Sequence, residues 1–131
     1  MISSSSSNLA VQESNMVFYV HETGRGANAT AHSVGGVEGK SANLSAFGTL
    51  IVVDNPVREG PDPSSKLLGR LQGIEASSDI RFINYHMLSS IIFEDGSSLQ
   101  IHGTIRTRLA KRELSIVGGD GRFKYARGYV V

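Results

Sequence analysis

Hydrophobic and polar residues alternate along much of this chain, with the two-residue period that β-strands produce. Within residues 98–106, the side chains of Leu99, Ile101 and Ile105 fall on one face, and polar side chains occupy the other. No segment shows a sustained 3.6-residue period with capping signals at both ends. The pattern therefore predicts a protein built from strands, without a regular helix.

Strand signals recur at short intervals and are separated by turn residues. We predict strands at residues 16–20, 50–53, 67–74, 83–93 and 98–106, and two more on either side of residues 118–121. Asp95-Gly96 predicts a hairpin turn between residues 83–93 and 98–106. In the last strand, Phe123, Tyr125 and Tyr129 are expected on one face. Residues 23–46 are expected to form a long loop with one short strand at most, because glycines interrupt them repeatedly.

Glycines also occur inside a predicted strand. In residues 67–74, Gly69 and Gly73 alternate with Arg70 and Gln72, which indicates curvature or a close approach of neighbouring backbones. Six or seven strands joined by short turns predict an antiparallel barrel or a sandwich, and the curvature favours the barrel.

Composition limits the functions that this fold could serve. The chain has 131 residues, 15 glycines, no cysteine and a formal net charge of +1. This length suits one domain with its own core, which we expect at residues 9–131 after a disordered serine-rich segment at residues 1–8. The small net charge gives no reason to expect nucleic acid or an anionic membrane as a partner. The chain shows neither a signal-peptide pattern nor an apolar run of membrane-spanning length.

Few motifs in the chain suggest a bound metal or cofactor. Residues 24–29 match the dinucleotide fingerprint G-x-G-x-x-A, but the following residues are too rich in glycine to form the helix that this motif requires. The four histidines lack metal-ligand spacing. We therefore expect neither a metal nor a cofactor. Asn28 and Asn43 begin N-glycosylation sequons, a mild indication of a secreted protein.

Two carboxylates follow predicted strands directly, Glu22 after residues 16–20 and Asp54 after residues 50–53. Both could lie at the mouth of a barrel, where an acid or base can face a pocket. Asp54 precedes Asn55 and Pro56, so a strand-ending turn is the simpler interpretation. Spacing alone leaves both alternatives open.

Several phrases occur in an order that resembles the dirigent family of plants: MVFYVHE, NATAHSVGG, FGTLIVVDNPVREGPDPSSKLLGRLQG and LSIVGGDGRFKYARGYV. The similarity extends from about Met16 to the end of the chain. It implies an all-β fold, a lipocalin-like (allene oxide cyclase-like) antiparallel barrel of eight strands. Family chains usually continue beyond the Ala-Arg-Gly motif, so we expect a barrel that is incomplete at its C-terminal end.

The resemblance also implies a function. Family members direct the stereoselective coupling of monolignol (phenylpropanoid) radicals in lignan biosynthesis, and some relatives cyclise quinone methides. The radicals come from a separate oxidase, a laccase or a peroxidase, and the barrel has no oxidative centre of its own. The resemblance further implies a homo-oligomer, a dimer or a trimer, in the apoplast. Without a signal peptide in this chain, a cytoplasmic location is the alternative.

Only some of the pocket residues usual in the dirigent family are found at the matching positions of this chain. Glu22 stands where the family has an aspartate after the histidine, and Arg112 matches the family arginine, so these two are the candidate catalytic residues. Ile105 occupies the place of a second pocket aspartate and cannot transfer a proton. Pocket tyrosines usual after the Gln-Gly pair are absent, because Gly73 is followed by Ile74, Glu75 and Ala76.

We take Asp54, Phe18 and Phe47 as candidate substrate contacts. The missing acid and tyrosines support an alternative function, a divergent barrel that binds small phenolics or a protein partner without acid-base chemistry.

Overall fold

The computed structural model describes residues 12–37 and 43–131. The segment predicted to be disordered, residues 1–8, lies outside the described residues. The described part contains eight strands and one short 3-10 helix: β1 (Tyr19–Val20), β2 (Ala31–Gly35), β3 (Leu50–Arg58), β4 (Leu67–Ser77), β5 (Asn84–Phe93), β6 (Ser98–Arg106), β7 (Leu114–Gly119), η1 (Gly121–Phe123) and β8 (Gly128–Val130).

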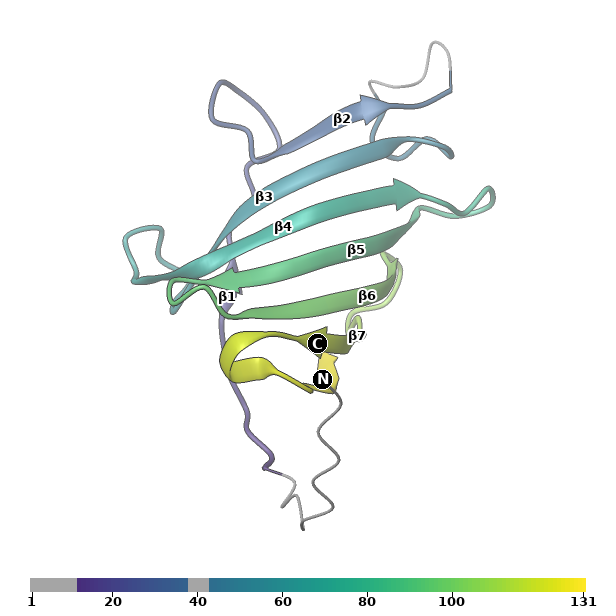
Figure 1. Cartoon of the computed structure of the whole chain (residues 1–131). Coiled ribbons are helices and arrows are strands. Elements are labelled where there is room, and N and C mark those ends of the chain that lie inside the picture. Colours follow the sequence, from purple (N-terminus) through teal and green to yellow (C-terminus); the bar gives the residue numbers. More distant parts are fainter. Residues whose placement is uncertain (1–11, 38–42) are drawn as a thin grey trace.

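All strands belong to one antiparallel sheet with the order β1-β3-β4-β5-β6-β7-β8, and β2 pairs with β3 beside β1. Consecutive strands from β3 to β8 are neighbours, so the sheet is a simple meander. Figure 1 shows that the sheet curls into a half-barrel, with the N-terminal segment passing behind it. The prediction of an all-β, eight-stranded antiparallel fold is confirmed.

The buried core lies on the concave face of the sheet. Alternation decides which residues reach it, since every second side chain of a strand points to the same face. In β3, for example, Ile51, Val53 and Val57 are buried. Among the described residues, the buried hydrophobic core consists of Ala31, Ile51, Val53, Val57, Leu71, Met87, Ile91, Phe93, Leu99 and Ile101.

Gly69 and Gly73 lie where β4 and β5 approach each other closely, as the sequence predicts. A Cβ atom on Gly69 would stand 2.2 Å from the carbonyl oxygen of Ile92, and one on Gly73 would stand 2.3 Å from that of Leu88. Carbon and oxygen atoms do not pack at such distances. Both positions therefore require glycine.

The C-terminal region differs from the prediction. Residues 121–123 form η1 rather than a strand, and Tyr125 has a left-handed backbone (φ 68°) and is 87% exposed. Gly121, also left-handed with φ 57°, begins this turn. The turn shortens the last strand to Gly128–Val130, so Phe123, Tyr125 and Tyr129 do not share a strand face.

The N-terminal strand is also shorter than predicted. Only Tyr19 and Val20 pair with β3, whereas residues 16–18 run beside the sheet without strand pairing. In the described part of the predicted long loop, residues 23–37 and 43–46, there is one short strand, β2.

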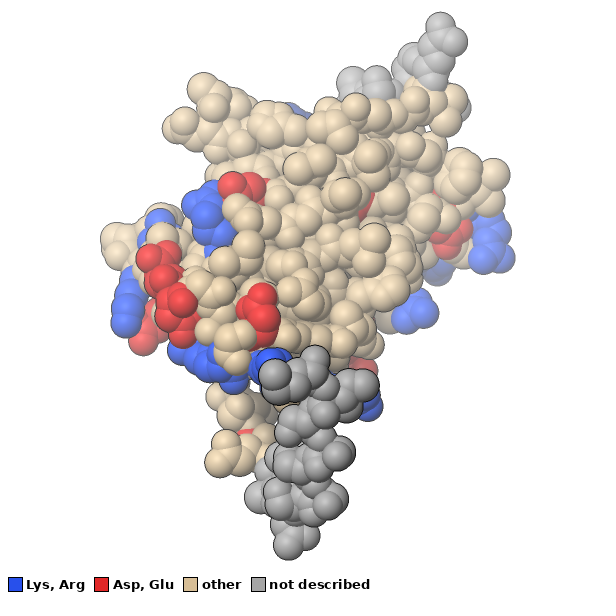
Figure 2. Space-filling model, viewed as in Figure 1, with Lys and Arg blue, Asp and Glu red and all other residues tan. Residues whose placement is uncertain are grey.

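The outer face of the sheet carries few charges. Figure 2 shows charged side chains gathered mainly near the ends of the strands and few over the middle of this face. Val52, Ile74 and Leu88 form one cross-strand row there, and each is 43–54% exposed. The half-barrel thus carries an exposed apolar row on its outer face in addition to its apolar interior.

Candidate functional site

A cavity of about 650 Å³ lies on the concave side of the sheet. This volume falls in the range of small-molecule sites, roughly 300–1,000 Å³. Its walls come from inner positions of β3 to β7, from the N-terminal segment with β1, and from residues 129–131. The lining residues are Met16, Val17, Phe18, Tyr19, Val20, Glu22, Asn55, Leu71, Glu75, Met87, Ile91, Ile101, Leu114, Tyr129, Val130 and Val131.

Most of this lining is apolar, and the strand alternation explains why. Leu71 and Ile91 are partners across β4 and β5, and Ile101 of β6 lines the cavity beside them; all three are buried. The cavity therefore offers an aromatic or aliphatic ligand a hydrophobic wall. Only a few polar groups interrupt this wall, which is the usual composition of a small-molecule site.

Glu22 is one of these polar groups. It follows β1, is exposed, and lines the cavity. The side-chain amide of Asn55 on β3 donates a hydrogen bond to Glu22 Oε2 at 3.1 Å. This hydrogen bond holds the exposed carboxylate at the edge of the cavity.

Asn55 itself was not among the residues predicted for the site. Its side chain is almost fully buried, with 2% of the residue exposed. While its amide nitrogen binds Glu22, its Oδ1 atom is buried and has no hydrogen-bond partner. Buried acceptors are normally paired, so this atom is available to a donor from a ligand.

Glu75 is a second carboxyl group in the cavity, and it too was missed. It lies on β4, four residues after Leu71 and on the same face. Burial raises the pKa of Glu75 above its usual range, and the charge of Glu22 raises it further. The alternation of residues 67–74, continued by one position, would have identified it as an inner residue.

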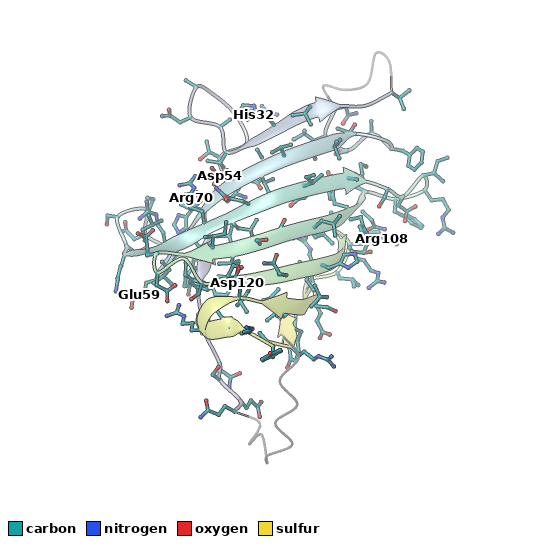
Figure 3. The ribbon with its side chains drawn as sticks, viewed as in Figure 1. His32, Asp54, Glu59, Arg70, Arg108 and Asp120 are labelled. Atoms are coloured by element: carbon teal, nitrogen blue, oxygen red, sulfur yellow. The ribbon has the colours of Figure 1, made fainter. Side chains whose placement is uncertain are left out.

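Asp54 lies on the opposite face of β3 from the cavity. Arg70 forms an ion pair with its carboxylate and donates a second hydrogen bond to its backbone oxygen at 2.8 Å. Gln72 Nε2 also donates to Asp54 Oδ1, at 3.2 Å. Figure 3 shows Asp54 and Arg70 together beside His32 on the outer surface, where these three residues line a shallow second hollow. Asp54 is therefore a residue of the outer face.

The other predicted site residues are widely separated. Phe18 lines the cavity. Phe47 is exposed in the segment before β3. Arg112 is exposed between β6 and β7, where it donates hydrogen bonds to the backbone oxygens of Leu109 and Thr107 at 3.2 and 3.1 Å. Neither Phe47 nor Arg112 belongs to the cavity lining.

The histidines do not form a larger ligand set. His86 and His102 approach each other on the outer face, with 2.7 Å between their Nε2 atoms. Within residues 12–37 and 43–131, no three histidine, cysteine, aspartate or glutamate side chains are grouped so that they could hold a metal ion. Residues 24–29 lead into strand β2 rather than a helix.

Both sequon asparagines, Asn28 and Asn43, are exposed and so are accessible to a modifying enzyme. None of the described helices is long and apolar enough to cross a membrane.

Comparison with protein families supports the resemblance seen in the sequence. The family model described as "Dirigent-like protein" matches residues 13–131. Dirigent protein 11 of Arabidopsis thaliana is 37% identical over 118 residues, covering 87% of this chain and 61% of the relative. Dirigent protein 23 of the same plant is 38% identical over 121 residues, covering 89% and 65% respectively.

Pterocarpan synthases are also similar to this chain. Pterocarpan synthase 1 of Glycyrrhiza echinata is 35% identical over 120 residues, covering 86% of this chain and 62% of the relative. The chain thus spans 61–65% of the length of these curated relatives.

Solved structures show the same relationship in three dimensions. The pterocarpan synthase dirigent protein GePTS1 superposes with a TM-score of 0.75 and 32% identity, covering 91% of this chain and 74% of the other. For PsPTS1, another pterocarpan synthase dirigent protein, the TM-score is 0.78 and the identity is 33%, covering 91% and 82%. The family model and these relatives together show that the chain belongs to the dirigent family.

Proposed function

We propose that this protein binds phenylpropanoid radicals in its concave cavity and directs their stereoselective coupling, as in lignan biosynthesis. A separate oxidase, a laccase or a peroxidase, supplies the radicals. The protein contributes position rather than oxidation. Two aromatic rings held in one relative orientation expose only one face of each to the other, so one stereoisomer predominates.

One observation carries this proposal, a cavity of about 650 Å³ whose wall is apolar except for a few polar groups. An aromatic ring gains free energy by leaving water for such a wall, at roughly 25 cal/mol for each Å² of apolar surface buried. The polar groups Glu22, Asn55 and Glu75 can fix the direction in which a phenol lies. Membership of the dirigent family supports the same function.

The test is oxidation of coniferyl alcohol by a one-electron oxidant, with and without the protein, followed by chiral chromatography of the coupled products. We expect an enantiomeric excess only when the folded protein is present. Racemic products in both reactions would overturn the proposal for this substrate.

A matched pair of variants tests whether the enantiomeric excess depends on the cavity. Leu114→Trp adds a large side chain to the cavity wall, whereas Val117→Trp adds the same side chain at an exposed position of the same strand. The enantiomeric excess should fall in the first variant and persist in the second.

A second candidate function is binding of small phenolics, or of a protein partner, without acid-base chemistry. Ile105 favours it, because this apolar residue packs against the core where the family has an acid. Calorimetric titration with coniferyl alcohol distinguishes the two functions. Binding heat without any enantiomeric excess would favour the second, and absence of binding would count against both.

We also propose that the protein self-associates through its outer face, as a dimer or a trimer. Leu50, Val52, Ile74, Leu88 and Ile92 leave 38–54% of their surfaces exposed on that face. Exposed apolar patches of this kind commonly mark protein interfaces. Light scattering coupled to size-exclusion chromatography should give twice or three times the 14.0 kDa mass of the chain; a monomer at all concentrations would refute this.

The proposed location is the apoplast. Exposed sequons at Asn28 and Asn43 are consistent with passage through the secretory pathway. Protein isolated from tissue that expresses it should therefore lose mass on treatment with an N-glycosidase. Unmodified protein at both asparagines would remove this support and favour the cytoplasmic alternative.

A further inference from the structure

Glu75 is placed where a proton donor would act on a ligand in the cavity. Its side chain lies between the apolar residues of β4 and β5, opposite Met87. No residue of the described ranges 12–37 and 43–131 donates a hydrogen bond to its carboxyl group, which is partly buried. Glu75 therefore has no evident structural partner.

Glu22 and Glu75 line the same cavity, so the charge of one affects the ionisation of the other. Two carboxylates that line one cavity resist being ionised together, so the more buried of them holds its proton more tightly than an ordinary glutamate does. Burial is the main cause that raises the pKa of Glu75, and the charge of Glu22 is the second. Glu22 is exposed and holds the amide of Asn55. The pair therefore places a partly buried carboxyl group with a raised pKa and an exposed carboxyl group in reach of the same ligand.

Asn55 supplies a third polar contact. Its amide nitrogen is occupied by Glu22 at 3.1 Å, and its buried Oδ1 lacks a partner. An acceptor left in this state is stabilised when a ligand hydroxyl donates to it. A hydroxylated ligand thus satisfies all three residues, whereas a hydrocarbon would satisfy none.

We propose that Glu75 is the proton donor and Glu22 the proton acceptor in the cyclisation of a phenolic quinone methide, with Asn55 Oδ1 accepting a hydrogen bond from a hydroxyl group of the ligand. This inference rests on the proposed function, since it assumes that phenolic intermediates enter the cavity. It assigns the donor to β4, whereas the family resemblance places the second acid on β6 at the position of Ile105.

The step balances without an oxidant or a reductant. The Glu75 proton passes to the carbonyl oxygen of the quinone methide, which becomes a phenol hydroxyl. A hydroxyl oxygen elsewhere in the same molecule forms a new C–O bond to the methide carbon, and its proton passes to Glu22. Substrate and product are isomers, and exchange of protons with solvent restores Glu75 and Glu22 to their initial states.

The experiment compares Glu75→Gln and Glu22→Gln with Glu94→Gln, a control at an exposed glutamate outside the cavity. Quinone methide formed by oxidising coniferyl alcohol is followed by its absorbance, and the ring-closed products are separated by chiral chromatography. General acid-base groups typically contribute about 10²–10⁴-fold in rate. We expect rate losses of this size in Glu75→Gln and Glu22→Gln and none in Glu94→Gln. The calorimetric affinity of the control for coniferyl alcohol should equal that of the wild type.

A pH profile separates proton donation from a purely structural role. The wild-type rate of cyclisation should fall as the pH rises and Glu75 loses its proton. This decrease at high pH should be absent from the pH–rate profile of Glu75→Gln and present again in that of Glu75→Asp. A Glu75→Gln variant as fast as Glu94→Gln, in the presence of an active wild type, would overturn this inference alone. A wild type that neither binds coniferyl alcohol nor changes the products would overturn the proposed function, and this inference with it.

Discussion

Gly73 connects the fold to the cavity, and its replacement by alanine is the most informative test of the packing described above. A Cβ atom at this position would stand 2.3 Å from the Leu88 carbonyl oxygen, 2.3 Å from Ser89 Oγ and 2.6 Å from Ser89 Cα. Neighbouring atoms normally stand about 3.5–4.0 Å apart, so β4 and β5 would have to separate locally by roughly 1 Å. Two of the three contacts are backbone atoms, which cannot rotate away.

The expected cost follows from this overlap. Adding a methyl group to a well-packed region typically costs about 1–3 kcal/mol, and Gly73→Ala belongs at the upper end because the strand backbone has to move. For a domain of this length, each kcal/mol lowers Tm by roughly 3–6 °C. At about 2–3 kcal/mol, we therefore expect Gly73→Ala to unfold about 6–18 °C below the wild type, by circular dichroism or calorimetry.

Gly118→Ala is the matched control. Gly118 is also a strand glycine without a left-handed backbone, but the nearest atom to its added Cβ would be Gln100 Cγ at 3.9 Å, an ordinary contact. This variant should unfold close to the wild-type temperature. Equal Tm values for the two variants would refute the argument that the approach of β4 to β5 requires glycine at residue 73.

Four further predictions concern other parts of the molecule. Ile91→Ala removes a fully buried side chain and should lower the free energy of unfolding in urea by about 2–5 kcal/mol; a loss below 1 kcal/mol would contradict the burial of this residue. Asp54→Asn breaks an exposed ion pair and should cost less than about 1 kcal/mol in the same assay, with no change in the enantiomeric excess. Ile74→Glu places a charge on the outer face and should lower the mass measured by light scattering to that of one chain without lowering Tm; an unchanged mass would rule out this residue as part of an interface. The pKa of Glu75 is raised in the folded protein, so its bound proton stabilises the fold at a pH below the ordinary glutamate pKa. This stabilisation is lost as the pH rises through the raised value. Glu75→Gln should therefore have a higher Tm than the wild type at neutral pH, and the difference should disappear in acid.

Much of the sheet follows from the sequence because its pattern is regular. In β4, β5 and β6 the alternation of side chains and the Asp95-Gly96 turn specify strand, partner and face together. The last strand was predicted too long for a local reason. Gly121 adopts a left-handed backbone and begins a 3-10 turn, and apolar residues within a turn look like strand residues when only their order is known.

The site could be predicted less well, because membership of a cavity depends on strand face as well as on residue type. Asp54 follows an apolar run and looks like a pocket acid, but it is one position out of phase with Ile51 and Val53. Asn55 is in phase with them and reaches the cavity. Glu75 reaches it for the same reason, as its spacing from Leu71 would have indicated. The burial that raises the pKa of Glu75 arises only when the sheet curls, and no local pattern contains that information.

The central claim is that the cavity orients phenolic radicals during coupling. The most direct measurement is the enantiomeric ratio of the products formed from coniferyl alcohol and a one-electron oxidant, as folded protein is added in increasing amounts up to saturation. We predict that one enantiomer increases with protein concentration and that Leu114→Trp, which narrows the cavity, reduces this increase. A ratio that stays at unity at every concentration of the wild-type protein would contradict the claim.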